Sequence, residues 1–413
     1  MSLKNQSSFW IIKSLSVLVA LFFLSEPVVL LMSQYFGISH FKNVFKIFYF
    51  LFVFLGGGYF ILNFEKLKIV KKNMFFASFF SFGYLLIVTA IGVKTNPTIY
   101  QFSTFLVHIF SILAFLFLFL SMRGRGGETL NLFFQKIMYL LPGMDFIMIL
   151  LVRWNPLQRD FYFNFDSAFL IPLFTLSLLR KNWFLIGTHF LLFYLHHKRG
   201  VLMAAVVGSA LYFIFLLSQK VWTVNFLVKA KKWRFGFLGI VFMMCAMGFW
   251  FANSNLSKKY SVKVFYVHQL IYQNSKNLIH TSHGERLMEV VSAVSQVTSE
   301  NIQRVIGGGI GWNYFLTPVE RRKYTHNSPI YLFLLSGVLG VMVWIWTFGR
   351  SFRLLYSADN IQSFFLLFLI ISLLHSLTTL NLFTNPLIPI AVSYLFESSK
   401  GLDAINAPLT RAT

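Results

Sequence analysis

The sequence predicts an all-α, polytopic membrane protein with about 12 transmembrane helices and one large outer loop that contains short helices. Two observations predict this class. Of the 413 residues, 57% are hydrophobic and only 12% are charged, whereas soluble domains carry about 25% charged residues. The apolar residues also gather in runs of roughly 20, the length that crosses a bilayer as a helix. A soluble fold is therefore excluded.

The apolar runs predict the membrane segments in order along the chain. They lie at 9–32, 47–63, 74–93, 101–121, 132–152, 167–179, 182–197, 200–218, 235–252, 328–347, 361–376 and 383–396. Four are short (167–179, 182–197, 361–376 and 383–396), so the count falls to ten if a pair forms one broken or re-entrant element. The chain divides into N-terminal membrane helices (1–252), a large outer loop (253–327), C-terminal membrane helices (328–396) and a cytoplasmic tail (397–413).

The distribution of Lys and Arg predicts the orientation, because short cytoplasmic loops carry an excess of these residues. With the N-terminus inside, the inner loops and both ends hold 19 Lys and Arg, and the short outer loops hold 7. Both termini are therefore expected in the cytoplasm and the stretch 253–327 outside. The net charge of +23 suits a protein that sits in lipid and handles anions. Nucleic acid is set aside as a partner, because the basic residues are scattered between long apolar runs.

The outer loop is expected to be folded. It contains nine Lys and Arg, four Glu and four of the ten histidines. Within it, ERLMEVVSAVSQV places apolar residues at a helical period, which predicts an amphipathic helix near 284–299 that lies over the membrane domain. The apolar positions are Leu287, Val290, Val291, Val294 and Val297.

The first candidate for chemistry is His326, in the run THNSPIYLFLLSGVLG. Ser328 is a good N-cap and Pro329 a good first helical residue, so His326 is expected just outside the N-terminus of a membrane helix, on the outer face. Such a helix end attracts phosphate, and a histidine there is suited to take a proton from a hydroxyl. An ordinary interfacial histidine beside a cap is the alternative.

Two basic motifs are candidates for holding an anion. Arg286 stands in GER at the start of the loop helix, where its guanidinium could pair bidentately with phosphate oxygens; a solvated Arg, or one paired with Glu285 or Glu289, is the alternative. Lys198 and Arg199 open an apolar segment on the outer side, against the usual bias of Lys and Arg. Interfacial anchors are the alternative for that pair.

Other residues stand out less sharply. Gly307-Gly308-Gly309-Ile310-Gly311-Trp312 predicts a tight turn, with backbone amides that could face an anion. Asp145 lies inside an apolar segment next to Pro142-Gly143, and an intramembrane acid is a functional candidate; pairing with Lys136 or an Arg is the plainer reading. His108, His189 and His375 are expected to be packing residues.

Several motifs are missing from the sequence. It has no Asp-x-Asp pair for magnesium, no Cys/His set with metal-ligand spacing, no phosphate-cradling GxxxxGK[ST] and no serine nucleophile elbow. Neither a metal nor a cofactor is therefore expected, and any chemistry on the outer side would depend on Arg and His.

Taken in order, these motifs resemble the bacterial O-antigen polymerase and O-antigen ligase superfamily. An Arg-Gly opens a membrane helix at its outer end, G-x-R opens an amphipathic helix in one long late loop, and GGGIGW and HNSPIYLFLLSGVLG follow. The motifs span residues 196–340, about a third of the chain. The resemblance implies a multi-pass protein of the bacterial inner membrane whose large loop is periplasmic.

The resemblance also implies an activity, which is metal-independent, inverting glycosyl transfer. The donor would be an oligosaccharide linked to undecaprenyl diphosphate, and the acceptor a glycan or lipid A core. Arg199 and Arg286, with Lys198 beside them, would hold the diphosphate, and His326 would activate the acceptor hydroxyl. Asn327, Gly309, Gly311 and Asp145 are accessory candidates.

Three functions stay open. Polymerisation of O-antigen or a similar surface polysaccharide is favoured, with a chain-length regulator protein as a further partner besides membrane lipids. A ligase that joins finished glycan to lipid A core or to a protein is the first alternative. A flippase for lipid-linked oligosaccharides is less favoured, because transporters often show matched broken helices in two halves and this outer loop has no counterpart in the first half.

Overall fold

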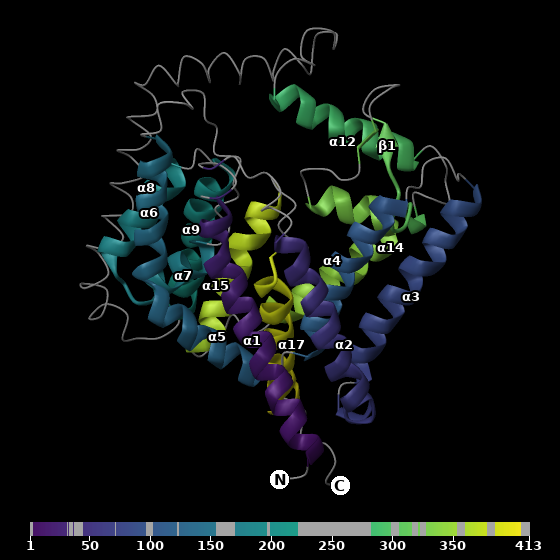
Figure 1. Ribbon diagram of the computed structural model, residues 1–413, viewed down its shortest axis with the longest axis horizontal. Coiled ribbons are helices and arrows are strands. Elements are labelled where there is room, and N and C mark those ends of the chain that lie inside the picture. Colours follow the sequence, from purple (N-terminus) through teal and green to yellow (C-terminus); the bar gives the residue numbers. More distant parts are fainter. Residues whose placement is uncertain are drawn as a thin grey trace. The chain divides into compact units, whose positions relative to one another are not determined.

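The computed structural model is helical almost throughout the residues that it describes, with one pair of two-residue strands as the exception there. Figure 1 labels the elements. The described residues are 3–30, 32, 36, 44–70, 72–95, 102–121, 124–153, 170–195, 199–221, 282–298, 305–315, 321–322, 328–352, 360–377 and 385–405. The predicted helical class is thus confirmed for this part of the chain.

The helices follow the predicted apolar segments closely. The first half of the chain forms α1 (Leu3–Leu30), α2 (Val44–Val70), α3 (Lys72–Thr95), α4 (Phe102–Ser121), α5 (Gly124–Ile137), α6 (Leu140–Arg153), α7 (Ile171–Leu179) and α8 (Trp183–Leu195). The second half forms α9 (Arg199–Val221), α12 (Ser282–Thr298), β1 (Tyr314–Phe315), β2 (Arg321–Arg322), α14 (Ser328–Ser351), α15 (Asn360–Ser376) and α17 (Leu387–Ile405). The predicted segment 235–252 lies outside the described residues.

The chain divides into two compact units. One comprises Met1–Ala210 and Ser292–Thr413, and the other comprises Leu211–Val291. The second unit takes the C-terminal part of α9 and the N-terminal part of α12. All contacts described below lie within the first unit, which contains most of the helices.

One predicted membrane segment, 132–152, is wrong as a single helix. The helix that starts at Gly124 ends at Ile137, a turn follows at Met138 and Tyr139, and α6 begins at Leu140. Pro142 does not mark the break, because a proline in the first turn of a helix removes no intrahelical hydrogen bond. The hydropathy of the run does not reveal this turn, although α5 has polar residues at both of its ends.

A tight turn joins α7 to α8 through Arg180, Lys181 and Asn182. Lys181 takes a left-handed backbone conformation with φ 55°, and the Asn182 amide donates back to the Ser177 carbonyl at 2.9 Å. The Asn182 side chain then caps α8, because its Oδ1 accepts from the Leu185 amide at 3.1 Å. This pair of short helices is one of the places where the sequence predicts a broken or re-entrant element.

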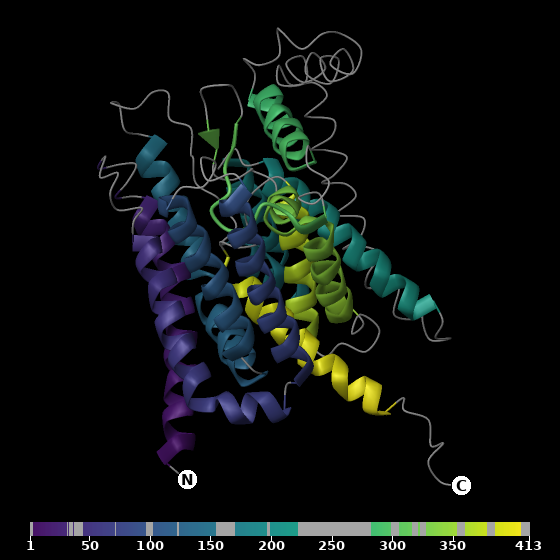
Figure 2. The same cartoon turned by 90° about the vertical axis from the view of Figure 1, so that its right-hand side faces the viewer.

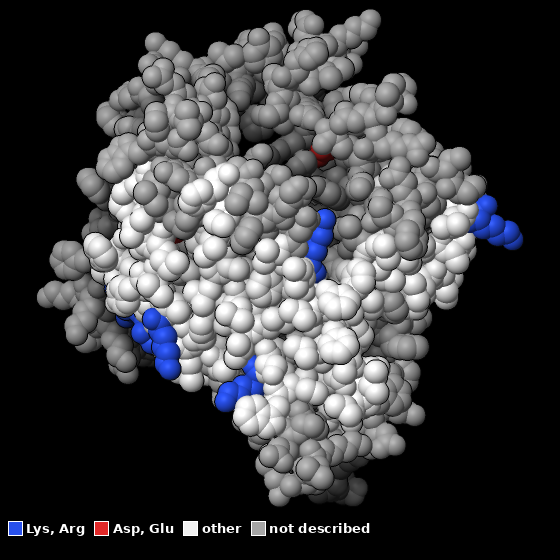
Figure 3. Space-filling model, in the orientation of Figure 1, with Lys and Arg blue, Asp and Glu red and all other residues white. Residues whose placement is uncertain are grey.

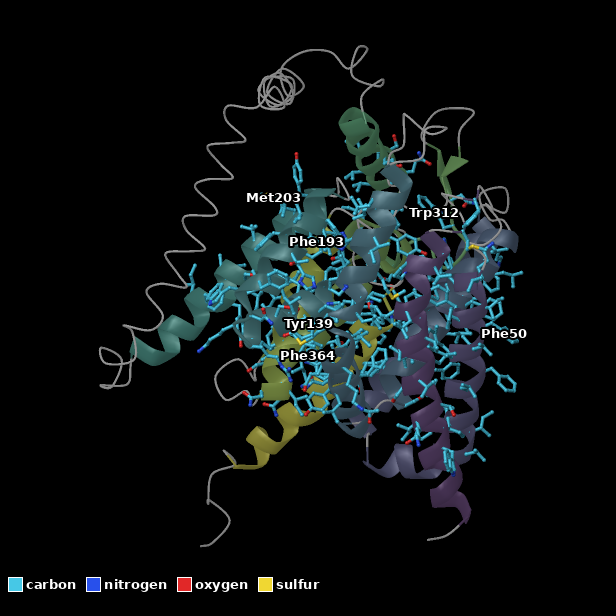
Figure 4. The ribbon with its side chains drawn as sticks, turned by 60° about the vertical axis from the view of Figure 1, so that its left-hand side comes forward. Phe50, Tyr139, Phe193, Met203, Trp312 and Phe364 are labelled. Atoms are coloured by element: carbon cyan, nitrogen blue, oxygen red, sulfur yellow. The ribbon has the colours of Figure 1, made fainter. Side chains whose placement is uncertain are left out.

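The core of the first unit lies around α15 and α17. α15 packs on α17 and α7, and α17 also packs on α4, α5 and α14. Phe364, Phe365 and Phe368 of α15 are fully buried, and the ring of Phe365 lies 5.0 Å from that of Tyr394 on α17. Figure 4 shows Phe364 inside the helices and Phe50 at their periphery. Since lipid is as apolar as Phe, such helices associate through close van der Waals packing.

In the part of the chain that the structure describes, three helical stretches are long and apolar enough to cross a membrane: Trp10–Val29, Val44–Asn63 and Ser328–Gly349. α7 is too short to cross alone, since nine residues span about 14 Å of a hydrocarbon core about 30 Å thick. The surface fits a lipid environment. Figure 3 shows mostly uncharged residues on the described part of one face, with Lys and Arg standing apart from one another.

α1, α2 and α4 pack side by side (Figures 1 and 2). On α2, four large apolar side chains share one exposed face at helical spacing: Ile47, Phe50, Phe54 and Ile61. The opposite side of α2 contacts α4 so closely that a Cβ on Gly56 would lie 2.6 Å from the Phe117 Cβ. α2 therefore combines a face for lipid with a face for close helix packing.

Candidate functional site

The residues predicted to carry the chemistry are described only in part. His326, Asn327 and Lys198 lie outside the described residues. Arg199 is the first residue of α9 and Arg286 the fifth of α12, but their side chains lie outside the described part. Arg199 belongs to the first compact unit and Arg286 to the second. Their approach to a shared phosphate stays a prediction.

The Gly-rich segment forms the turn that the sequence predicts. Gly307, Gly309 and Gly311 have φ of 84°, 81° and 88°, a region in which residues with a Cβ are strained. The turn is also closely packed, because a Cβ on Gly309 would lie 2.6 Å from the Thr89 Cα and one on Gly307 would lie 2.5 Å from the Gly337 nitrogen. Glycine is thus required here by both conformation and space.

The amides of this turn bond protein acceptors, contrary to the expectation that they could face an anion. Gly308 donates to the Leu334 carbonyl at 2.7 Å, and Gly309 to the Leu335 carbonyl at 2.9 Å. Ile310 donates to Thr89 Oγ1 at 2.7 Å. Gly309 and Gly311 are therefore structural residues of a turn that is fastened to its neighbours.

The acceptors at Leu334 and Leu335 are available because α14 is broken. Gly337 has φ 59° and ψ −162°, which is not helical, so carbonyls just before it lose their intrahelical donors. Figures 1 and 2 show the two parts of α14 running in different directions. Gly337 and Gly307 face each other, because a Cβ on Gly337 would lie 2.5 Å from the Gly307 nitrogen.

One side chain on α3 also forms hydrogen bonds to both the break and the turn. The Tyr84 hydroxyl lies 2.9 Å from the Ile306 carbonyl oxygen and 3.0 Å from that of Ser336. A phenol has one proton, so it is shared between these two acceptors. One residue of α3 thereby holds both the start of the turn and the end of the first part of α14.

α4 contributes a histidine to the same region. Gly311 donates its amide to His108 Nδ1 at 3.4 Å. The ring stands edge-on to Tyr331 of α14, with centroids 5.3 Å apart. His108 is 3% exposed, in agreement with the prediction that it is a packing residue. His189 and His375 are buried in the same way.

The predicted loop helix is confirmed, and its predicted apolar stripe is buried only in part. Ala293 and Val297 of α12 are fully buried and cluster with Trp312 and Leu334, whereas Val291 is 53% exposed. The buried positions follow an i, i+4 line that also includes Glu289. Figure 4 places Trp312 at the level of this helix.

The side chain of Trp312 packs directly on the Gly-rich turn. A Cβ on Gly308 would lie 2.6 Å from the Trp312 ring, so the indole rests directly on the backbone of the turn. Trp312 is 4% exposed and Asn313 1%. The C-terminal part of α12, the turn and the first part of α14 therefore form one packed assembly.

Asp145 lies on α6 and is fully buried, so its position within the helical interior agrees with the prediction. The assembly around the turn is formed by α3, α4, α12 and α14, whereas Asp145 belongs to α6. Within the described residues, no three His, Cys, Asp or Glu side chains gather as a metal site would require.

Sequence reasoning missed Tyr84, Thr89 and the break at Gly337. Tyr84 and Thr89 stand in an apolar segment, and their partners lie more than 200 residues away along the chain, so no local pattern marks them. Gly337 did carry a signal. It follows Ser336, and Ser-Gly pairs are common at sharp helix kinks.

No family model matches the chain, and no curated protein sequence matches it. A function is therefore argued from the residues and from this geometry.

Proposed function

We propose that the protein is a metal-independent, inverting glycosyltransferase at the periplasmic face of the bacterial inner membrane. It transfers a glycan from undecaprenyl diphosphate to a hydroxyl of an acceptor sugar, and so polymerises O-antigen or a similar surface polysaccharide. The observation that carries the proposal is the packed assembly of turn and helix. The Gly-rich turn is fastened to the part of α14 that begins at Ser328, two residues after His326.

This assembly suits catalysis because it holds a helix N-terminus in place. A helix N-terminus favours negative charge, and a diphosphate leaving group needs charge stabilisation. The first part of α14 is anchored at its far end by Gly308 and Gly309. Its start is therefore fixed by a rigid element, which precise transfer chemistry requires.

The donor is proposed to be held by Arg199 and Arg286, with Lys198 beside them. Arg199 stands at the N-terminus of α9. Arg286 lies seven residues before Ala293, and at 3.6 residues per turn these two positions share one face of α12. Ala293 is fully buried, so the register favours a position for Arg286 on the packed face of the helix.

The proposed reaction is a direct displacement at the anomeric carbon. The acceptor hydroxyl forms the new C–O bond from the face opposite the diphosphate, and the electron pair of the breaking C–O bond leaves with the diphosphate. The hydroxyl proton passes to His326. The arginines neutralise charge that develops on the leaving group, which is the largest contribution such a site makes.

A flippase for lipid-linked oligosaccharides is the competing class, and the break in α14 favours it because discontinuous helices line many transporter sites. In such sites, unwound backbone carbonyls coordinate the coupling ion. Here the Leu334 and Leu335 carbonyls accept from the glycine turn, and the Ser336 carbonyl accepts from Tyr84. The backbone at the break is thus already bonded within the protein, which favours the enzyme.

The glycan produced by a deletion strain tests the proposal. Loss of polymer with a single repeat unit still attached to its final acceptor supports a polymerase. Polymer that accumulates on the carrier lipid indicates a ligase instead. Accumulation of carrier-linked repeat units on the cytoplasmic side contradicts both and indicates a flippase.

A further inference from the structure

The contacts of Tyr84 join three segments that are distant in sequence. Its hydroxyl lies on α3, Ile306 begins the Gly-rich turn 222 residues later, and Ser336 ends the first part of α14, 252 residues later. α3 packs against α14, so the phenol bridges elements that already touch.

The hydroxyl completes a row of hydrogen bonds across the break. Gly308 and Gly309 donate to the Leu334 and Leu335 carbonyls, and Tyr84 bonds the next carbonyl, that of Ser336. Three successive carbonyls at the end of a short helix are therefore bonded from outside it. This row determines the angle at which the first part of α14 leaves the break.

That angle has a large effect at the other end of the short helix. From Ser336 back to Ser328, eight residue steps span about 12 Å, so a rotation of about 5° at the break moves the N-terminus by about 1 Å. A displacement of this size in a catalytic group can lower a rate about 100-fold.

We propose that Tyr84 is a positioning residue for glycan transfer. It holds the Gly-rich turn and the break at Gly337 in one arrangement, and thereby holds the N-terminus of α14 beside which His326 stands in the sequence. The inference rests on the proposed function, since it assigns Tyr84 a role in that same reaction through His326. Tyr84 itself touches neither donor nor acceptor in this role.

Tyr84→Phe tests the proposal, because it removes the hydroxyl and keeps the ring. Tyr139→Phe is the matched control. Tyr139 is 60% exposed and accepts a hydrogen bond from Asn182, so this variant also loses one phenol bond, but far from the turn. Both proteins are studied at full length in lipid nanodiscs.

Three measurements are made on each variant. The first is single-turnover transfer from carrier-linked glycan extracted from the deletion strain. The second is equilibrium binding of undecaprenyl diphosphate alone, and the third is hydrogen exchange of peptides that cover residues 305–313. We expect Tyr84→Phe to transfer about 10- to 100-fold more slowly, to bind undecaprenyl diphosphate within about threefold of wild type, and to exchange faster in this segment. Tyr139→Phe should match wild type in all three.

The outcomes separate the inference from the function on which it rests. Faster exchange with an unchanged transfer rate overturns the positioning role. An equal loss of transfer and of donor binding also overturns it, because that would indicate a purely structural residue. Unchanged exchange shows that the hydroxyl does not hold the turn and overturns the inference as well. A wild-type protein that binds the carrier but transfers nothing overturns the proposed function, and the exchange result then reports on the Tyr84 contact alone.

Discussion

Single glycines determine how the turn at 307–311 can fold. Gly309 combines a φ of 81° with a close approach to Thr89, whose Oγ1 accepts the neighbouring Ile310 amide at 2.7 Å. The threonine can accept this bond only because nothing larger than hydrogen stands on Gly309. Conformation, packing and hydrogen bonding therefore converge on one residue.

Gly309→Ala is expected to destabilise the protein by about 2–4 kcal/mol, from left-handed strain and overpacking against Thr89. Gly187→Ala is the control, since Gly187 lies within α8 and has nothing within 4 Å of its would-be Cβ; it should be neutral or stabilise by up to about 1 kcal/mol. Denaturation in mixed micelles measures both. Equal stability of the two variants would contradict the proposed packing of the turn.

His326→Ala is expected to lose transfer about 10²- to 10⁴-fold while donor affinity is kept, because it removes a general base and leaves the diphosphate-binding arginines in place. Transfer by the wild type should fall as the pH drops through the range in which His326 takes up a proton, since the imidazolium cannot accept another. His280→Ala, in the same loop, is the control. Near wild-type transfer by His326→Ala would move the base elsewhere, with Asp145 and His283 next.

At the scale of helices, hydropathy predicts well which runs form helices, but it predicts poorly where the backbone of a helix breaks. The runs at 9–32, 47–63 and 101–121 correspond to α1, α2 and α4 because most of their residues are apolar, even though Pro27 lies within α1 and three glycines lie within α2. The run 132–152 is equally apolar but turns at Met138, and α14 is continuous in hydropathy but broken at Gly337. A break depends on partners that are distant in the sequence, such as Tyr84, because these partners donate hydrogen bonds to the carbonyls that the break leaves without intrahelical donors.

The packed face of α12 differs in part from the predicted stripe. Of the predicted positions, Val297 is fully buried and Val291 is exposed, whereas Glu289 and Ala293, which the stripe did not include, are buried. Small Ala293 allows the helix to approach Trp312 and Leu334, and size is a property that a hydrophobic period does not weigh. The turn itself was predictable because four glycines within five residues indicate it, whereas the residues that bind it were not.

The contact between α2 and α4 depends on the small size of Gly56. Gly56→Ala should push the helices apart and cost about 1–3 kcal/mol, because the new methyl would meet the Phe117 Cβ at 2.6 Å. Gly58→Ala, on the same helix with nothing within 4 Å, is the control and should be tolerated. Thermal unfolding in one detergent compares them, and a reversed order would mean that α2 presents another face to α4.

For the whole molecule, the orientation in the membrane decides whether the proposed chemistry is on the correct side. Helices long and apolar enough to span occur in both halves of the chain, and the 19 to 7 division of Lys and Arg favours cytoplasmic termini. A lipid-diphosphate donor in the periplasm can reach His326 only if residues 253–327 lie there. Orientation is thus a requirement of the function and is testable without any substrate.

Cysteine labelling provides the test, since the chain has one cysteine, Cys245, and a Cys245→Ala background is free of thiols. Ser275→Cys in the outer loop should react with a membrane-impermeant maleimide in intact spheroplasts. Thr410→Cys in the C-terminal tail should react only after the membrane is permeabilised, and permeabilised cells also show that both thiols are reactive. Labelling of Thr410→Cys alone in intact spheroplasts would show that the orientation is the opposite of the predicted one. His326 would then lie in the cytoplasm, where nucleotide-activated sugars are the ordinary donors. The charge bias predicts the opposite result, because Lys and Arg in short loops resist translocation while a long loop crosses largely regardless of its charge.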